Sequence, residues 1–165
     1  MRVRPWILLI FALAAGVAAP AAAKEKEERV WTLSGLDKKK SETVSLDYSV
    51  PESDYITIVF SCKPKSGAVD VFISETNKKL KPGRKATATL AAGEAKATFP
   101  GKLLVNEDAG VPSFEGSLPA KEPLFAALAG GAATLAITVG ASTDTETLKG
   151  AAEKFAKFNA ACAKP

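Results

Sequence analysis

Short stretches that alternate between apolar and polar residues recur along this chain, and they limit its fold more than any other feature. In the stretch TVSLDYSV, the side chains of Val44, Leu46 and Tyr48 fall on one face of an extended backbone, with polar neighbours between them. Residues 55–62 and 68–75 repeat the pattern. A period of two residues is typical of β-strands that bury one face, so we predict that these three stretches are half-buried strands.

Further strands follow from the same pattern, with turn residues between them. Strands spaced roughly 8–12 residues apart are typical of all-β sandwiches and barrels. We therefore predict a mainly β fold, an antiparallel β-sandwich of about 8–10 strands. The additional strand segments are residues 31–33, 86–90, 94–99, 101–107, 112–118 and 133–141.

Two segments break the alternation and predict helices. In residues 122–129, Pro123 suits a first helical position, Leu124, Phe125 and Leu128 share one side, and Gly130 suits a stop. This short helix either covers the core or, if exposed, offers an apolar contact surface. A C-terminal helix is predicted at about residues 150–161.

The two cysteines both fall on predicted apolar faces. Cys62 follows Ile58 and Phe60 at alternate positions of its strand. Cys162 follows Phe155 and Phe158 at helical spacings on the C-terminal helix. A widely spaced pair on buried faces favours a structural disulfide between Cys62 and Cys162 over a redox-active site, which usually has its cysteines close in sequence and one sulfur exposed.

The first residues have the pattern of a secretory signal peptide. Arg2 and Arg4 precede a short apolar run, and small residues at Ala21 and Ala23 suit a signal peptidase. The apolar run is shorter than the roughly 20 residues of a membrane-spanning helix, so we expect cleavage and no transmembrane anchor afterwards. We predict a cleaved signal peptide at residues 1–23, a charged flexible lead-in at 24–29, and one β-rich domain at 30–165.

The amino-acid composition limits the classes of catalytic and metal site that the chain can form, and it bears on the cellular compartment. The chain has no histidine, which excludes histidine-dependent acid–base catalysis, serine–histidine and cysteine–histidine nucleophile pairs, and histidine-ligated metal sites. Without Arg2 and Arg4, 20 basic residues face 18 acidic ones, and a net charge of +2 requires no nucleic-acid partner. No asparagine starts a glycosylation motif. Together with an alanine-rich signal, this favours export to the periplasm of a Gram-negative bacterium, or secretion.

Four segments carry a resemblance to known proteins: the early Trp31 and the stretches IVFSCKPKSGAVDVFI, PLFAALAGGAATLAITV and LKGAAEKFAKFNAAC. In these the chain resembles a group of small, uncharacterised exported bacterial proteins and, more distantly, the invasion-associated locus B-like family. The resemblance implies a β-sandwich closed by a C-terminal helix that begins near Gly150. It implies no activity and no site residues.

The stretch NKKLKPGRK is the strongest candidate for binding. It gathers five bases around a Pro-Gly turn, which suits phosphates of lipopolysaccharide or of anionic lipid. The alternative is a solvated hairpin tip or a charged edge that resists aggregation. If Lys38, Lys39 and Lys40 lie at the same end of the fold, they extend one basic patch. The five bases are Lys78, Lys79, Lys81, Arg84 and Lys85.

Carboxylates show no catalytic or metal-binding arrangement in the sequence. Asp70 falls on the solvent side of its strand, and we expect Glu107, Asp108, Asp144 and Glu146 in turns. Carboxylates in turns usually cap the backbone or are solvated. Serine at position 113 lacks the glycine spacing of a nucleophile elbow. We predict no catalytic residues, no metal and no cofactor.

These observations favour a non-enzymatic periplasmic binding domain. Its partner would be a protein or an envelope component, and not nucleic acid. The alternative is a histidine-independent hydrolase that uses Asp, Glu, Lys, Ser or Tyr. A deep pocket with convergent polar groups would favour the enzyme, whereas a filled core with a basic end would favour binding.

Overall fold

The computed structural model describes residues 28–36 and 42–164. The predicted signal peptide, residues 24–27 of the lead-in and Lys38, Lys39 and Lys40 lie outside them. The described chain forms nine strands and two helices. The strands are β1 Val30–Ser34, β2 Val44–Ser49, β3 Ile56–Cys62, β4 Ala68–Ile73, β5 Lys85–Ala92, β6 Ala95–Leu104, β7 Ser113–Pro119, β8 Thr134–Val139 and β9 Ser142–Thr147; the helices are α1 Pro123–Ala129 and α2 Ala152–Cys162.

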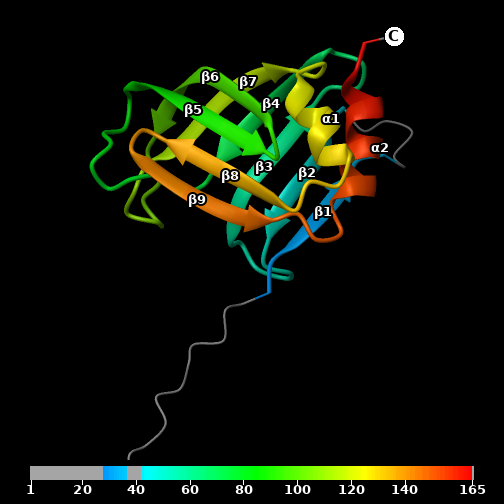
Figure 1. Cartoon of the computed structure of the whole chain (residues 1–165). Coiled ribbons are helices and arrows are strands. Elements are labelled where there is room, and N and C mark those ends of the chain that lie inside the picture. The colour runs from blue at the N-terminus through cyan, green and yellow to red at the C-terminus, as the bar shows by residue number, and fades with distance from the viewer. Residues whose placement is uncertain (1–27, 37–41, 165) are drawn as a thin grey trace, which may run out of the picture.

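All nine strands belong to one antiparallel sheet, in the order β1-β2-β3-β4-β7-β6-β5-β8-β9. The sheet curls into a half-barrel, and the two helices lie together at one end of it (Figure 1). The expected sandwich is not confirmed, because the strand pairing runs without a break from β1 to β9. A sandwich needs two separate sheets, whereas this core is enclosed by one sheet that bends around it.

The predicted alternation decides which side chains fill the half-barrel. Val44, Leu46 and Tyr48 of β2 are buried, and the residues between them are partly exposed. Strands β3 and β4 follow the same rule. The inward residues form one continuous hydrophobic cluster with both helices. The mainly β fold with two helices therefore agrees with the sequence pattern.

The two helices bridge opposite walls of the half-barrel. Helix α2 packs on β1 and β2, α1 packs on β5 and β6, and the two helices contact each other. Leu124, Phe125 and Leu128 of α1 are fully buried, so this helix covers the core rather than offering an apolar contact surface. Gly130 remains in a right-handed helical conformation, and Gly131 takes the positive φ of 88°.

An aromatic cluster joins the helices to the first strands. The ring of Trp31 lies 4.9 Å from that of Tyr48 and 5.0 Å from that of Phe155, measured between centroids. Phe60 contacts Phe155 at 5.5 Å and Phe125 at 5.9 Å in edge-on geometry. Aromatic pairs at these separations add to the stabilisation that burial alone provides, so β1, β3, α1 and α2 are held at a common centre.

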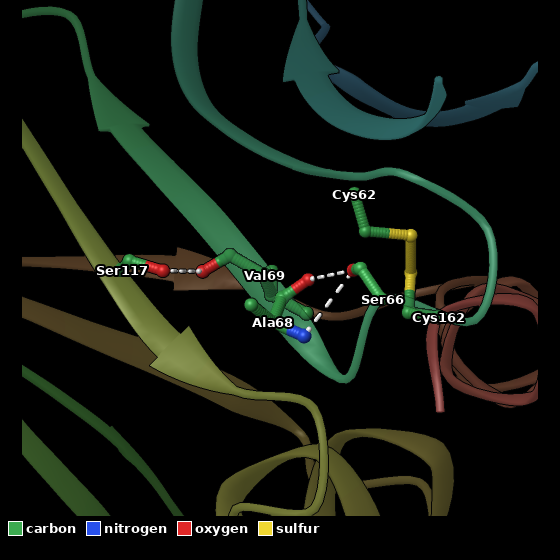
Figure 2. Close-up of a disulfide and its surroundings, with 6 residues drawn as sticks. All are labelled: Cys62, Ser66, Ala68, Val69, Ser117 and Cys162. Atoms are coloured by element: carbon green, nitrogen blue, oxygen red, sulfur yellow. Dashed lines mark hydrogen bonds between the residues drawn. A yellow bond between two sulfur atoms is a disulfide. The ribbon is translucent and has the colours of Figure 1, made fainter. Parts of the chain in front are cut away.

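The disulfide joins the end of β3 to the last residue of α2. The sulfur atoms of Cys62 and Cys162 are 2.01 Å apart, and the two residues are at most 2% exposed. Figure 2 shows the bond beside the turn that leads into β4, where the Ser66 hydroxyl bonds the backbone of Ala68. The amide of Gly67 also donates to the carbonyl of Cys162. The C-terminal helix is thus tied to the sheet by a covalent bond and by backbone hydrogen bonds.

Two strand assignments differ from the sequence pattern. The stretches expected as separate strands at 94–99 and 101–107 form one strand, β6, although Pro100 interrupts it. The strand continues because Gly101 pairs with Gly116 of β7 where the two backbones approach closely. Asp144 and Glu146, expected in a turn, lie in the edge strand β9, Ser142–Thr147. No residue of β9 is buried, so the strand shows no apolar alternation.

Candidate functional site

The strongest candidate site is built on residues 77–85, which we call the basic loop. It connects β4 to β5 and lies at the end of the sheet away from the two helices (Figure 1). Asn77 starts it: its side-chain oxygen accepts the amide of Lys79, and its carbonyl accepts the amide of Leu80, both at 2.9 Å. Asparagine favours turns for this reason, so the loop has a defined start.

The middle of the basic loop is fastened to two neighbouring segments. Leu80 is half-buried and lies against Gly140 in the turn between β8 and β9. The amide of Gly83 donates to the carbonyl of Leu103 at 2.8 Å, and the amide of Leu103 donates to the carbonyl of Arg84 at 2.9 Å. Gly83 has a φ of 77°, which glycine adopts without strain. These contacts give the basic side chains a fixed backbone.

The basic loop borders a cavity of about 530 Å³ on the outer face of β5 and β8. Four of the five predicted bases line it, and the fifth, Lys78, is exposed on the same loop. Every charged residue among those lining the cavity is basic. The lining residues are Lys79, Leu80, Lys81, Arg84, Lys85, Ala86, Thr87, Thr89, Leu103, Thr138 and Gly140.

The floor of this cavity carries threonine hydroxyls. Of the lining residues, Thr89 shares a hydrogen bond of 2.9 Å with Thr98, and Thr138 shares one of 2.8 Å with Thr143. A hydroxyl can donate and accept at once, so these groups can also bond an oxyanion. The cavity therefore combines positive charge with neutral donors. Lys38, Lys39 and Lys40, which were predicted to extend the basic patch, lie outside the described residues.

A second polar cluster lies at the seam between β1 and β9. Arg29 is 3.3 Å from the carboxylate of Glu146, and its guanidinium lies over the ring of Tyr55 at 4.9 Å. Asp144 and Glu75 line the same small cavity of about 180 Å³. A hydrogen bond to Glu75 raises the pKa of the Tyr55 phenol, with burial adding to it. This cluster joins the start of β1 to the end of β9, which is a structural task.

The sequence pattern missed this seam cluster. Arg29 was expected in the flexible lead-in, and Asp144 and Glu146 in a turn. The structure places both acids in β9, where Glu146, whose side chain is 12% exposed, forms the ion pair with Arg29. No local pattern signals the contact, since Arg29 and Glu146 are 117 positions apart.

Other polar residues singled out in the sequence have structural roles. Asp70 is exposed on its strand, as expected. Ser113 is 2% exposed, and its hydroxyl donates to the carbonyl of Ser74 at 2.6 Å. Asn106 donates to the same carbonyl at 2.9 Å. These bonds fasten the segment before β7 to the end of β4.

The described residues, 28–36 and 42–164, show neither a cluster of metal-binding side chains nor a membrane-spanning helix. They contain no group of three or more His, Cys, Asp or Glu side chains placed to hold a metal ion. Within the same residues, neither helix has the length and apolar character needed to cross a membrane.

Comparisons with known proteins found no match to this chain. No family model matches it, and neither a curated protein nor a solved structure does. The resemblance to the invasion-associated locus B-like family therefore stays a prediction.

Proposed function

We propose that this protein is an exported, non-enzymatic binding domain that associates with an anionic component of the bacterial cell envelope through the basic loop. The observation that carries this proposal is the convergence of Lys79, Lys81, Arg84 and Lys85 on one cavity whose lining contains no carboxylate. The disulfide is compatible with an oxidising compartment such as the periplasm.

The electrostatics of such a site favour phosphate-bearing surfaces. A basic residue near an anionic membrane contributes about 1 kcal/mol, and the effect falls off within a Debye length. Five bases together can therefore hold the protein at an anionic surface at low salt and release it at high salt. Fixing the loop through Leu80 and Gly83 reduces the conformational entropy lost on binding.

The test is co-sedimentation with vesicles of phosphatidylglycerol and phosphatidylcholine, compared with vesicles of phosphatidylcholine alone. We expect binding to the anionic vesicles that decreases from 50 mM to 500 mM NaCl. Changing the five bases to Gln should abolish it. The five bases are Lys78, Lys79, Lys81, Arg84 and Lys85.

The matched control removes the same charge elsewhere. Lys63, Lys65, Lys96, Lys121 and Lys149 are all exposed, and changing them to Gln should leave most of the vesicle binding intact. Equal loss in both variants would show that net charge alone is responsible and would contradict a site at the basic loop. In cells, salt should release the wild-type protein from membranes, and the basic-loop variant should fractionate as soluble.

A further inference from the structure

The cavity at the basic loop adjoins a larger groove on the outer face of the sheet. This groove has a volume of about 760 Å³ and crosses β3, β4, β7, β6 and β5. Lys85 lines both hollows. The strand register joins them further, because Lys85 pairs with Lys102 and Thr87 pairs with Pro100. The cavity and the groove are therefore neighbours on the outer face of β5 and β6.

The charge and polarity of the lining side chains change from the basic-loop cavity to the groove. The basic loop supplies only positive charge. Next come Lys85 and Lys102, and Lys102 is 3.6 Å from the carboxylate of Glu115. Among the described residues Lys85 has no ion-pair partner. The groove then presents the half-buried ring of Phe72 and the ring of Pro100, which are apolar.

The carboxylates in the groove argue against a polyanion. In the strand register Glu115 lies between Lys102 and Phe72, and Asp70 lies next to Ser117. The hydroxyls of Ser61 and Ser117 line the groove with them. A polymer with a charge at every unit would bring negative charge beside both carboxylates, and like charges at close range are unfavourable. A ligand with negative charge at one end and an apolar body meets no such repulsion. Its charge would lie among the bases, and its body over Phe72 and Pro100.

We propose that the basic-loop cavity and the outer groove form one site for a single anionic lipid molecule. The phosphate headgroup lies between Arg84 and Lys85, and one acyl chain follows the groove along Phe72 and Pro100. The proposal rests on the proposed function, because it uses the same basic loop. It adds that the protein binds an individual lipid molecule and contacts its acyl chain, in addition to being attracted to a charged surface.

The test uses water-soluble lipids below their micelle concentration, measured by calorimetry on the full chain. The probes are dibutyryl and dihexanoyl phosphatidylglycerol, dihexanoyl phosphatidylcholine, and glycerol 3-phosphate as the headgroup alone. Each methylene that leaves water changes affinity about fourfold. The one acyl chain in the groove is two methylenes longer in dihexanoyl than in dibutyryl phosphatidylglycerol. We therefore expect one-to-one binding that is about fifteenfold tighter for the dihexanoyl lipid. Dihexanoyl phosphatidylcholine should bind much more weakly.

Variants separate the chain from the headgroup. Phe72→Ser should weaken dihexanoyl phosphatidylglycerol at least fivefold and leave glycerol 3-phosphate unchanged. Lys85→Gln should weaken both. Val59→Ser is the matched control, because Val59 pairs with Phe72 on the neighbouring strand and does not line the groove. It should bind every probe as the wild type does.

The outcomes distinguish this proposal from the function on which it rests. If anionic vesicles bind but affinity does not increase with chain length, the groove takes no acyl chain, and the lipid site is wrong while the envelope role stands. Binding to vesicles with no binding of any monomeric probe has the same meaning. If neither vesicles nor monomeric lipids bind, both proposals are wrong.

Discussion

Trp31 in the first strand donates its indole N–H to the carbonyl oxygen of Thr147 in the last strand, across 2.9 Å. Every pairing along the sheet is antiparallel, and eight pairings separate β1 from β9, so these two strands point in the same direction. Direct closure of the barrel would therefore need a parallel pairing. Side chains join the two edges instead, through Trp31 and through the ion pair of Arg29 with Glu146.

Replacing Trp31 with Phe tests this junction. The ring contacts with Tyr48 and Phe155 are largely kept, but the carbonyl of Thr147 loses its donor. We expect the free energy of unfolding to fall by about 1–2 kcal/mol, measured by urea denaturation. Thr145→Ala on the exposed part of β9 is the control and should change it by less than about 0.5 kcal/mol. An unchanged urea midpoint for Trp31→Phe would contradict a stabilising junction.

Removing the disulfide should lower stability strongly. Closing a loop of 100 residues in the unfolded chain is worth about 4–5 kcal/mol in the chain-entropy model, and both sulfurs are buried among apolar groups. Cys162→Ser should therefore lower the melting temperature and expose one titratable thiol at Cys62. The double variant Cys62→Ser with Cys162→Ser should melt close to the reduced wild type. Equal melting temperatures for the oxidised wild type and Cys162→Ser would contradict a structural role.

Gly101 should tolerate no side chain. A Cβ atom there would lie 2.1 Å from the carbonyl oxygen of Glu115 and 2.4 Å from the ring of Phe114. We expect Gly101→Ala to destabilise the protein by about 3 kcal/mol, near the top of the range for overpacking, measured by thermal unfolding. Gly110→Ala is the comparison, because its Cβ would meet no atom within 4 Å, although its φ of 62° brings some strain. The prediction is wrong if Gly101→Ala costs no more than Gly110→Ala.

The phenols of Tyr48 and Tyr55 should ionise at a higher pH in the folded protein than in the unfolded chain. Burial raises the pKa of Tyr48, with the charge of Glu146 adding to it, and the hydrogen bond to Glu75 raises the pKa of Tyr55. A raised folded pKa contributes stability that is fully present below the unfolded pKa of about 10. That stability is lost as pH rises through the folded pKa.

Tyrosinate absorbance against pH measures this effect. The native chain should ionise at a higher pH than the urea-unfolded chain. Glu75→Ala should move the titration of Tyr55 back toward its ordinary value, and Tyr48→Phe leaves Tyr55 as the one phenol to follow, because the chain contains two tyrosines. If native and unfolded chains ionise at the same pH, neither phenol is held in its neutral form.

Much of the fold could be predicted from local patterns. The alternation in β2, β3 and β4 identified the buried face of each strand, because a strand that buries one side must place apolar residues at every second position. The helix spacing of Phe155, Phe158 and Cys162 identified the buried side of α2 for a similar reason. Both helices begin and end within two residues of the expected positions.

Other features had no local signal. Strand β9 has polar residues on both faces, as an exposed edge allows, so its pattern is that of a turn. The continuity of β6 through Pro100 depends on the close approach of β7 at Gly116. Pro100 is tolerated in the middle of β6 because the residues around it pair with β5 and β7. The sequence alone does not identify these neighbouring strands.

The sequence by itself determined where most strands and both helices form, which faces they bury, and that five bases stand around one Pro-Gly turn. These features follow from residues within a few positions of one another, and a chain with two cysteines allows only one internal disulfide. Only the tertiary structure decided that one sheet curls into a half-barrel, that Trp31 meets Thr147, and that Lys85 joins a basic cavity to the groove that carries Phe72 and Pro100. These depend on long-range pairings such as β4 with β7 and β5 with β8. The curvature of the sheet and the packing of its core select such pairings together, and no local pattern encodes them.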